Sequence, residues 1–447
     1  MAIAFTLPLG SRIAQAQVAT GPGNEQLASA YVVIGSDGSI TLNFGGAEMG
    51  QGSMSGLAQL LAEELMVDWN QITIRQSPVD PIVSYLTGGS SAIAGRYTKL
   101  RTAGAAAREL LIAAAMQLQA TQDTNRDHYA AASAVVTHLP SNASWPYAVL
   151  ARPASNLTAP ADLRLTDPAN FRLIGKAVPR IDIPSKVDGS AQYGIDKWLP
   201  NMVFAAIKHC PTLGGTLASP PSKPSGAIAV IPCSAVDSRG KVVAGTVNAV
   251  AVVSTDTWQA MRMARSLSVS WKLPASTGDV DSTQLATQSS TLMANGAALV
   301  AEPTPPSGYT PASFAAVIEP AVKSALGTPT RERTFTLPFL AHGTMEPLNC
   351  TVVPTVSGGT VQALDIYAPT QGASWVVGYA QALSGLAAAK INVHTMLLGG
   401  GLGRKFEMDF VGQAIQVAMS VKRPVKLTWS REEDFTHDQY RPCALVN

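Results

Sequence analysis

Cysteine, charge and long apolar runs are all scarce in this chain of 447 residues. The chain has no C-x-x-C pair, which argues against an encoded iron–sulfur cluster or structural zinc site. Only 14% of the residues are charged and the formal net charge is +2, which argues against a nucleic-acid-binding surface. No apolar run reaches the about 18 residues that a membrane-spanning helix needs. The four widely separated cysteines, which we expect to be small hydrophobic residues, are Cys210, Cys233, Cys350 and Cys443.

Apolar residues, by contrast, are abundant. They make up 46% of the chain, and the mean hydropathy is +0.14. Such a chain must bury a large core or cover part of its surface with partner subunits. The length suits about two to four domains.

The N-terminus has a short apolar run followed by Ala14-Gln15-Ala16, the pattern of an export signal with an A-x-A cleavage site. The basic segment that normally precedes the apolar run is missing. Residues 1–27 are therefore interpreted as the remnant of an export signal that has lost an upstream twin-arginine part, with an ordinary disordered tail as the alternative.

The chain is organised around a glycine-rich stretch at 399–405, GGGLGRK. A half-buried strand is predicted at 391–398, helical spacing begins at Phe406, and a second strand is predicted at 425–429. A glycine loop that opens onto a helix offers free backbone N–H groups to phosphate or pyrophosphate. A tight turn between core elements is the alternative.

Two further small-residue loops precede helices. A predicted hairpin at 31–44 runs into GGAEMGQG at 45–52, and a helix capped by Ser53 follows at 54–67. A strand at 72–76 precedes TGGSS at 87–91, which leads to an alanine-rich helix at 97–119. Three such loops in one chain favour a large ligand with several phosphates or a dinucleotide-like part.

These strand–loop–helix units predict a mixed α/β (α+β) fold of several units. A small α/β module should contain strands near 202–208, 227–231, 241–244 and 247–253 and a helix at 257–267. The last unit should contain a strand at 361–367 and a helix at 373–383. The expected ranges are 1–27 (signal remnant), 28–165 (N-terminal segment ending in a connector with a short hairpin), 166–271 (α/β module), 272–330 (Ser/Pro/Ala-rich excursion) and 331–447 (last domain).

Six stretches together resemble the molybdenum-binding subunit of the xanthine dehydrogenase/aldehyde oxidase family, in the order expected for it. HDQYRP at 437–442 fits the same branch, which looks like the isoquinoline 1-oxidoreductase beta subunit and the membrane-bound aldehyde dehydrogenase large subunit. The resemblance implies a multidomain molybdopterin-binding architecture in which 166–271 is a hammerhead-like module. The six stretches are GGAEMGQG (45–52), TGGSS (87–91), RLIGKAVPRIDIPSKVDGSAQYGID (172–196), MEPLNC (345–350), APTQ (368–371) and GGGLGRK (399–405).

What the resemblance implies is a molybdenum hydroxylase. The metal is held by a pterin dithiolene, in bacteria usually as molybdopterin cytosine dinucleotide, and needs no protein ligand. A water-derived oxygen is inserted at an aldehyde carbon or at an electron-poor ring carbon beside nitrogen. Electrons pass to iron–sulfur clusters on a separate small 2Fe–2S subunit and, in this branch, often to a cytochrome c subunit. The expected location is the periplasm, or the periplasmic face of the inner membrane through these partners.

The resemblance also carries over site residues. Gln51 and Gln371 match glutamine positions around molybdenum, where a neutral amide can hydrogen-bond the cofactor. Arg404 is expected to serve cofactor or substrate, unless it is a surface residue after a turn. Glu346 either faces substrate or is a buried, paired carboxylate, and Glu48 either serves the site or only holds its own loop. The other residues that match cofactor-binding loops are Gly50, Gly52, Gly88, Gly89, Ser90, Ser91, Gly400, Gly401, Leu402 and Gly403.

Two departures from the family pattern affect the expected activity. Leu402 stands where the family usually has Phe, which removes an aromatic face for a flat substrate and leaves the substrate class open. The family also continues for about another domain, which carries a glutamate general base that has no counterpart before Asn447. General bases contribute about 10²–10⁴-fold, so we expect the isolated chain to be nearly inactive, with the remainder supplied as another polypeptide or lost by truncation.

Two other functions were weighed. The first is a non-catalytic remnant or assembly partner that binds no cofactor. The second is a flavin- or nicotinamide-dependent dehydrogenase that uses the loop at 399–405 for phosphate. A complete G-x-G-x-x-G opening a βαβ unit, with an acidic residue about 20 positions further on, is not found there, which counts against it.

Overall fold

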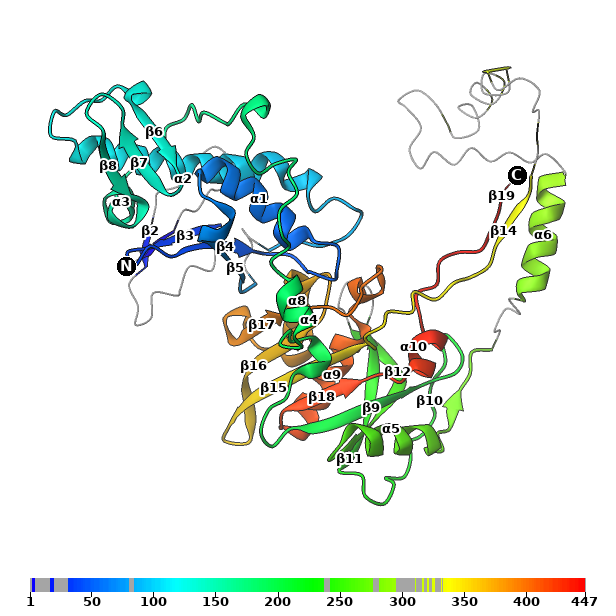
Figure 1. The fold of residues 1–447 in the computed structure, drawn as a ribbon. Helices are drawn as coiled ribbons and strands as arrows, with labels where there is room; N and C mark the ends of the chain where they lie inside the picture. Colours follow the sequence, from blue (N-terminus) through cyan, green and yellow to red (C-terminus); the bar gives the residue numbers. More distant parts are fainter. Residues whose placement is uncertain are drawn as a thin grey trace.

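Two lobes make up the computed structural model (Figure 1). It describes residues 2–4, 17–19, 31–79, 84–236, 242–275, 281–294 and 333–446, with single positions between 310 and 331. The described part is mixed α/β, as predicted. Most of residues 1–27, interpreted as an export-signal remnant or a tail, and most of the excursion at 272–330 lie outside the described residues. Among the described helices, none is long and apolar enough to cross a membrane.

The N-terminal lobe is a mixed sheet of five strands, in the order β2-β1-β3-β4-β5, covered by two packed helices, α1 and α2. The predicted hairpin is confirmed, since β3 and β4 pair antiparallel, and β5 adds in parallel to β4. The helices can approach closely because Gly104 has no side chain. A Cβ at Gly104 would lie only 2.6 Å from the Leu61 carbonyl oxygen. The elements are β1 (Ala2–Ala4), β2 (Gln17–Ala19), β3 (Val32–Gly35), β4 (Ile40–Phe44), β5 (Ile72–Gln76), α1 (Ser53–Leu65) and α2 (Tyr97–Leu118).

Ser53 does not cap α1, so this prediction is wrong. Ser53 is the first helical residue, and the N-cap is Gly52, whose φ of 80° lies in the left-handed region. The Ser53 hydroxyl instead accepts a hydrogen bond from the side-chain amide of Gln51 at 2.8 Å. A glycine before the helix allows the backbone to enter from a conformation that a side chain disfavours.

The range expected to be a connector with a short hairpin holds a three-stranded sheet and a helix. The strands are β6 (Tyr129–Ala132), β7 (Val135–His138) and β8 (Ala143–Pro146), followed by α3 (Tyr147–Ala154). The first turn is made by Ser133 and Ala134, with φ values of 46° and 62°. The hairpin is present, but the sequence did not predict the additional strand or the helix α3.

The C-terminal lobe is one sheet of seven strands in the order β11-β12-β9-β18-β15-β16-β17. β9 lies parallel to β18, so the two ranges expected as a separate module and a last domain share a single sheet. The segments predicted at 241–244 and 247–253 are one strand, β12, and the strand β15 was not anticipated. The strands are β9 (Val203–His209), β11 (Ala229–Val236), β12 (Val242–Ser254), β15 (Asn349–Ser357), β16 (Thr360–Ala368), β17 (Ile391–Thr395) and β18 (Val425–Thr428).

Helices cover both faces of this sheet. α8 (Ala373–Ser384) and α9 (Asp409–Val421) pack on one face over a core that includes the buried Cys233 and Cys350. α5 (Thr257–Ser266) packs on the other face. Burial raises the pKa of the Cys233 thiol to about 12, which fits the expected role as a small hydrophobic residue.

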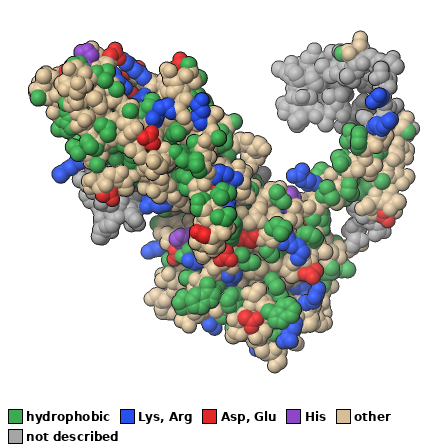
Figure 2. Space-filling model, in the orientation of Figure 1, with side chains coloured by type: hydrophobic (Ala, Val, Ile, Leu, Met, Phe, Trp, Pro, Cys, Tyr) green, Lys and Arg blue, Asp and Glu red, His purple; other side chains and the backbone are tan. Residues whose placement is uncertain are grey.

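Shorter elements complete the described part. The short strands β14 and β19 pair antiparallel, and the helix α6 packs beside β19 on the arm that leaves the lobe (Figure 1). On the face drawn in Figure 2, acidic and basic side chains are interspersed. These elements are α4 (Ile183–Val187), β10 (Thr216–Leu217), β13 (Trp271–Lys272), α6 (Ser282–Ala294), β14 (Phe335–Leu337), α10 (Arg431–Thr436) and β19 (Ala444–Val446).

Candidate functional site: a junction of three loops

The three predicted loops meet where the two lobes touch. The backbone N–H of Thr87 donates to the Gln371 carbonyl oxygen at 2.8 Å, and the Gln371 side-chain amide donates back to the Thr87 carbonyl oxygen at 2.8 Å. The Thr87 hydroxyl accepts from the N–H of Ala47 at 2.9 Å. The N–H of Leu398 donates to the Glu48 carbonyl oxygen at 3.1 Å. Hydrogen bonds therefore join all three loops, although Thr87 lies 40 residues after Ala47 and Gln371 lies 284 residues after Thr87.

Gln371 is the centre of this junction. Its side chain is buried, and its Oε1 accepts from the N–H of Gly403 at 3.0 Å. A Cβ at Gly401 would lie 2.7 Å from that Oε1 and 2.5 Å from the sulfur of Met49. Only glycine at position 401 leaves room for the segments that carry Met49, Gln371 and Gly401 to approach this closely.

Several backbone N–H groups at the junction have no partner within the described part of the chain. Ser90 and Leu402 both adopt φ of 53°, and Gly400 and Gly403 adopt 96° and 104°. Successive residues in such conformations point neighbouring N–H groups outward and form concave anion sites. The groups that donate no hydrogen bond are the backbone N–H groups of Gly89, Ser90, Gly400, Gly401 and Leu402.

The first loop is held by Glu48. This buried carboxylate accepts from the N–H groups of Gly50 at 2.9 Å, Gly52 at 3.0 Å and Met54 at 2.9 Å. The structure therefore gives Glu48 the loop-holding role that the sequence left open.

Gln51, at the tip of the first loop, is also bonded within that loop. Its amide nitrogen donates to the Ala47 carbonyl oxygen at 2.9 Å and to the Ser53 hydroxyl at 2.8 Å, and its Oε1 accepts from the N–H of Met49 at 2.8 Å. Both amide N–H groups are thus used locally. The expected contact between Gln51 and a cofactor stays a prediction.

Glu346 is a buried carboxylate with four donors. Its Oε1 accepts from the N–H of Ile195 at 2.9 Å and from the side-chain amide of Asn349 at 3.1 Å. Its Oε2 accepts from the N–H of Gly399 at 2.9 Å and from the ammonium group of Lys405 at 2.5 Å. These contacts favour the buried, paired role over contact with substrate, and they anchor the start of the glycine loop at 399–403.

Arg404 is not a surface residue, so the alternative given for it is wrong. Its side chain is fully buried and donates to both carboxylate oxygens of Asp409, at 3.1 and 2.8 Å. Its Nε lies 3.0 Å from Asp438 Oδ1, although its N–H is not aimed at that oxygen. Burial alone would lower the pKa of Arg404, but the two carboxylates hold that pKa above its ordinary value. Arg404 fixes the end of the loop; its expected contact with cofactor or substrate stays a prediction.

Two residues of the junction were not singled out from the sequence. Arg180 donates to the Gly50 carbonyl oxygen at 3.0 Å and is itself held by Asp182 at 3.0 and 2.6 Å. His342 lies beside the glycine loop, where a Cβ at Gly403 would be 3.5 Å from its Nε2, and its Nδ1 lies 3.0 Å from Asp438. Arg180 belongs to the family-matching stretch at 172–196, whereas His342 lies three residues before the stretch at 345–350. The Gly50 and Asp438 partners are 130 and 96 residues away in the sequence.

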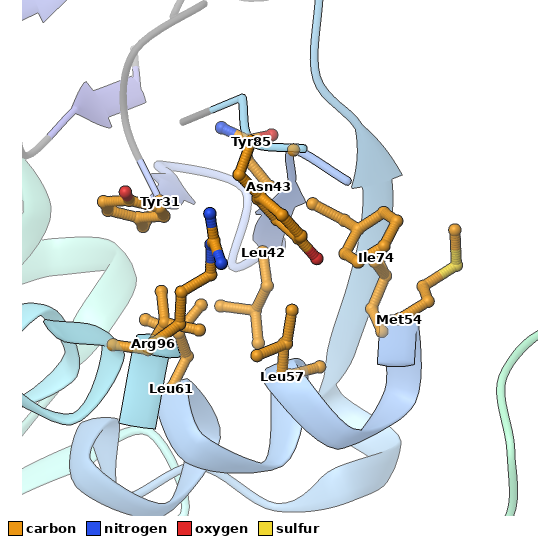
Figure 3. Close-up of a pocket in the computed structure, with 13 residues that line it drawn as sticks. Tyr31, Leu42, Asn43, Met54, Leu57, Leu61, Ile74, Tyr85 and Arg96 are labelled. Carbon is orange, nitrogen blue, oxygen red and sulfur yellow. The ribbon is translucent and has the colours of Figure 1, made fainter. Parts of the chain in front are cut away.

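A narrow cavity lies behind the first loop (Figure 3). Its volume is about 20 Å³, enough for roughly one water molecule, so it is too small for a cofactor. The Arg96 guanidinium lies 3.3 Å from the centre of the Tyr85 ring, and a Cβ at Gly46 would clash with that ring at 2.2 Å. Burial raises the pKa of Tyr85. The cavity therefore belongs to the packing of the lobe, in which Tyr85 and Arg96 pack against the loop at Gly45 and Gly46.

Comparison with known proteins assigns the loops of the junction to two matched domains. Two family models, both described as molybdopterin cofactor-binding domain, match the chain, one over residues 7–170 and the other over residues 317–446. The loops at 45–52 and 87–91 lie in the first match, and the loops at 368–371 and 399–405 lie in the second. The junction thus lies between two molybdopterin cofactor-binding segments.

The chain is also similar to curated oxidoreductases. The chain is 27% identical over 453 residues to the isoquinoline 1-oxidoreductase subunit beta of Brevundimonas diminuta, covering 92% of this chain and 55% of the relative. It is also 27% identical over 426 residues to the membrane-bound aldehyde dehydrogenase (pyrroloquinoline-quinone) of Gluconacetobacter polyoxogenes, covering 92% and 51%. A solved quinoline 2-oxidoreductase from Pseudomonas putida 86 matches with a TM-score of 0.42 and 17% identity, over 60% of this chain and 36% of that one.

The chain belongs to the molybdopterin-binding large subunits of the xanthine dehydrogenase/aldehyde oxidase family. It spans about half the length of the two curated relatives described above.

Proposed function

We propose that this chain forms part of the catalytic subunit of a molybdenum hydroxylase that oxidises an aldehyde or an N-heterocycle, with oxygen derived from water. The observation that carries the proposal is the junction in which Gln371 is bonded to both Thr87 and Gly403. The relatives named above supply the two substrate classes, since one is named for isoquinoline and the other for aldehyde.

The residues present at the junction fit a molybdopterin cofactor. The unpartnered N–H groups of Gly89, Ser90, Gly400, Gly401 and Leu402 suit the negative charge of a pterin phosphate. One N–H of the Gln371 amide remains after its bond to Thr87, and a neutral donor of this kind suits an oxygen or sulfur atom of the cofactor. When bound, the molybdenum centre would supply two-electron oxidation of the substrate.

The residues of this chain would bind and orient rather than react. Glu48, Glu346 and Arg404 fix the loops, so that their N–H groups are aimed before the cofactor binds. The Leu402 side chain is 58% exposed beside these groups, where it would offer an apolar surface to the substrate. The glutamate general base that the resemblance implies stays a prediction.

The proposal extends to the partners. One relative is named a beta subunit, which supports an assembly of several chains. We propose a 2Fe–2S small subunit and a cytochrome c subunit as electron acceptors, molybdopterin cytosine dinucleotide as the cofactor form, and a periplasmic location.

Cofactor content tests the proposal directly. The chain would be produced with its neighbouring-gene subunits in a host that makes the cofactor, and molybdenum and pterin would be measured after purification. We expect both in the wild-type complex and a large loss in Gly401→Ala, because a Cβ there meets both Gln371 and Met49. Gly378→Ala is the matched control, since a Cβ at this helical position meets nothing within 4 Å. A folded wild-type complex without molybdenum and pterin would overturn the proposal.

A further inference from the structure

A second group of polar side chains lies in the small sheet of β6, β7 and β8, at the outer end of the N-terminal lobe and away from the loop junction (Figure 1). Oδ2 of Asp123 lies 2.5 Å from His128 Nδ1 and 3.0 Å from His138 Nε2. One ligand atom from each residue lies within 4.8 Å of the other two. Two imidazole nitrogens therefore converge on one carboxylate oxygen.

The frame around this group is rigid. His138 ends β7, is buried, and stands opposite Tyr129 of β6 in the sheet register. The Tyr129 hydroxyl donates to the Asp123 carbonyl oxygen at 2.6 Å, and the N–H of Leu139 donates to the His128 carbonyl oxygen at 2.7 Å. The sheet thus places His138, and these two hydrogen bonds tie the segments that carry Asp123 and His128 to its neighbouring residues.

The other atoms of these side chains already have partners. His138 Nδ1 lies 2.7 Å from the Ser141 hydroxyl and also contacts the Gln119 side-chain amide nitrogen. His128 Nε2 lies 3.1 Å from the Asn125 side-chain nitrogen. Oδ1 of Asp123 accepts from the N–H of Asn125 at 2.8 Å, which leaves Oδ2 for the shared position. A metal-binding histidine donates a hydrogen bond from its second ring nitrogen. Cation binding here therefore requires Ser141 to accept from His138 Nδ1 and Asn125 to turn its amide oxygen toward His128 Nε2.

We propose that Asp123, His128 and His138 bind a divalent transition-metal cation of the Zn²⁺ type. Imidazole and carboxylate ligands suit this class of cation, and three protein ligands leave a fourth position for water. The small number of cysteines, which argued against structural zinc, does not bear on a site made of histidine and aspartate.

The size of the group fits this cation after a small adjustment. Zn²⁺ binds nitrogen and oxygen at about 2.0–2.2 Å, so two tetrahedral ligand atoms stand about 3.3 Å apart. The present separations of 2.5 and 3.0 Å must therefore open by about 0.8 and 0.3 Å. His128 can supply this movement, because its side chain is 42% exposed at the end of a single turn, Arg126–His128.

A second cluster, His209, Glu433 and His437, does not have this geometry. The Nδ1 atoms of His209 and His437 lie 2.6 and 3.4 Å from Glu433 Oε2. However, the two rings are stacked at 4.4 Å with 29° between their planes, so one cation cannot lie in the plane of both rings, as imidazole ligation requires. His209 Nε2 lies 2.8 Å from the Gln413 amide nitrogen, and His437 Nε2 lies 3.0 Å from the Cys210 carbonyl oxygen. This cluster is a buried hydrogen-bonded stack and serves as an internal comparison.

The test is a titration of the full chain, stripped of metal by a chelator and free of any polyhistidine tag, with Zn²⁺ followed by calorimetry. We expect one bound Zn²⁺ per chain. His128→Asn should weaken this binding by at least the 10–100-fold that is typical for loss of a ligand's hydrogen-bond partner. Co²⁺ in place of Zn²⁺ should give the visible absorption of a four-coordinate site, and this absorption should vanish in the same variant.

His394→Asn is the matched control. Its side chain is 42% exposed and lies 3.0 Å from Asp365, but no third ligand is nearby among the described residues. This control and His437→Asn should bind Zn²⁺ like the wild type. Circular dichroism would establish that His128→Asn is folded. Absence of Zn²⁺ binding by the wild type, equal binding by His128→Asn, or loss of binding in His437→Asn would each overturn the proposal.

Discussion

Two of the glycine loops are stabilised in the same way but over very different distances in sequence. Glu48 accepts hydrogen bonds from Gly50, Gly52 and Met54, all within six residues of itself. Glu346 accepts from Gly399 and Ile195, which are 53 and 151 residues away. In both loops a buried carboxylate replaces the water that glycine N–H groups would otherwise bind.

The difference lies in how each charge is balanced. Glu346 has a buried cation, Lys405, at 2.5 Å, whereas the nearest cation to Glu48 is the partly exposed Arg180 at 3.5 Å. Burial lowers the pKa of Lys405, and the nearby Glu346 opposes that shift. The second loop therefore depends on a buried ion pair between distant segments, and the first mainly on local hydrogen bonds.

The largest expected effect comes from Glu346→Gln. The change leaves the buried Lys405 charge without a partner, which should lower the free energy of unfolding by about 3–5 kcal/mol. Urea unfolding would measure it. Glu432→Gln is the matched control, because Glu432 is 65% exposed in a surface ion pair with Arg265, and pairs of that kind contribute about 0–1 kcal/mol.

A second variant shows whether the ion pair itself is responsible. Glu346→Gln combined with Lys405→Met removes both charges and should recover part of the loss, since a neutral pair of similar size no longer leaves an isolated charge. A double variant no more stable than Glu346→Gln would mean that Lys405 does not determine the cost.

Glu48→Gln should have a smaller effect of about 2–3 kcal/mol, because the charge is lost and only one oxygen remains for the three N–H donors. Hydrogen exchange would separate the two loops. In this variant, faster exchange should be confined to residues 49–54, whereas Glu346→Gln should also increase exchange at Gly399 and Ile195. Spread of the Glu48→Gln effect to residues 399–403 would contradict the local character of the first loop.

The same contrast explains how much of the site could be predicted from the sequence. The hairpin at β3 and β4, the strand β5 and the helices α2, α5 and α8 were predicted because their apolar spacing is regular over their whole length. The third loop was expected to open directly onto a helix. However, α9 begins only at Asp409, because a single turn, Arg404–Phe406, intervenes.

Contacts between distant segments were not predictable from local pattern. The parallel pairing of β9 with β18 joins two ranges that looked separate. The burial of Arg404 depends on Asp438, and the support of Gly50 depends on Arg180, 130 residues later. Spacing within one segment carries no information about such partners, so the sequence indicated the loops and their residues but not what holds them.

A pH dependence tests the support that Arg180 gives to the first loop. The hydrogen bonds from Arg180 are the main cause of a lowered Asp182 pKa, which lies at about 2 compared with the ordinary 3.8. Burial opposes this shift, and the nearby Lys186 adds to it. A lowered carboxyl pKa stabilises the folded state above the ordinary pKa, and this stabilisation is lost as the pH falls through the folded value.

Asp182→Asn should therefore be less stable than the wild type at pH 7 by about 2 kcal/mol, the free energy that corresponds to this shift. The difference should disappear between about pH 4 and pH 2, as measured by urea unfolding across that range. A constant difference down to pH 2 would show that the charge of Asp182 is not the cause.

The smallest expected effect is at Leu402, and its sign carries the information. Leu402 has φ of 53° and is 58% exposed, so its backbone is held in the left-handed region with little burial to offset the strain. Glycine at this position should be more stable than alanine by up to about 1 kcal/mol. At Gly378, inside α8, alanine should be the more stable by about 0.5–1 kcal/mol. Comparing Leu402→Gly with Leu402→Ala, and Gly378→Ala with the wild type, by thermal unfolding gives both signs. The same order at both positions would mean that Leu402 relaxes out of the left-handed region, and the N–H groups of the loop would then not be fixed before a cofactor binds.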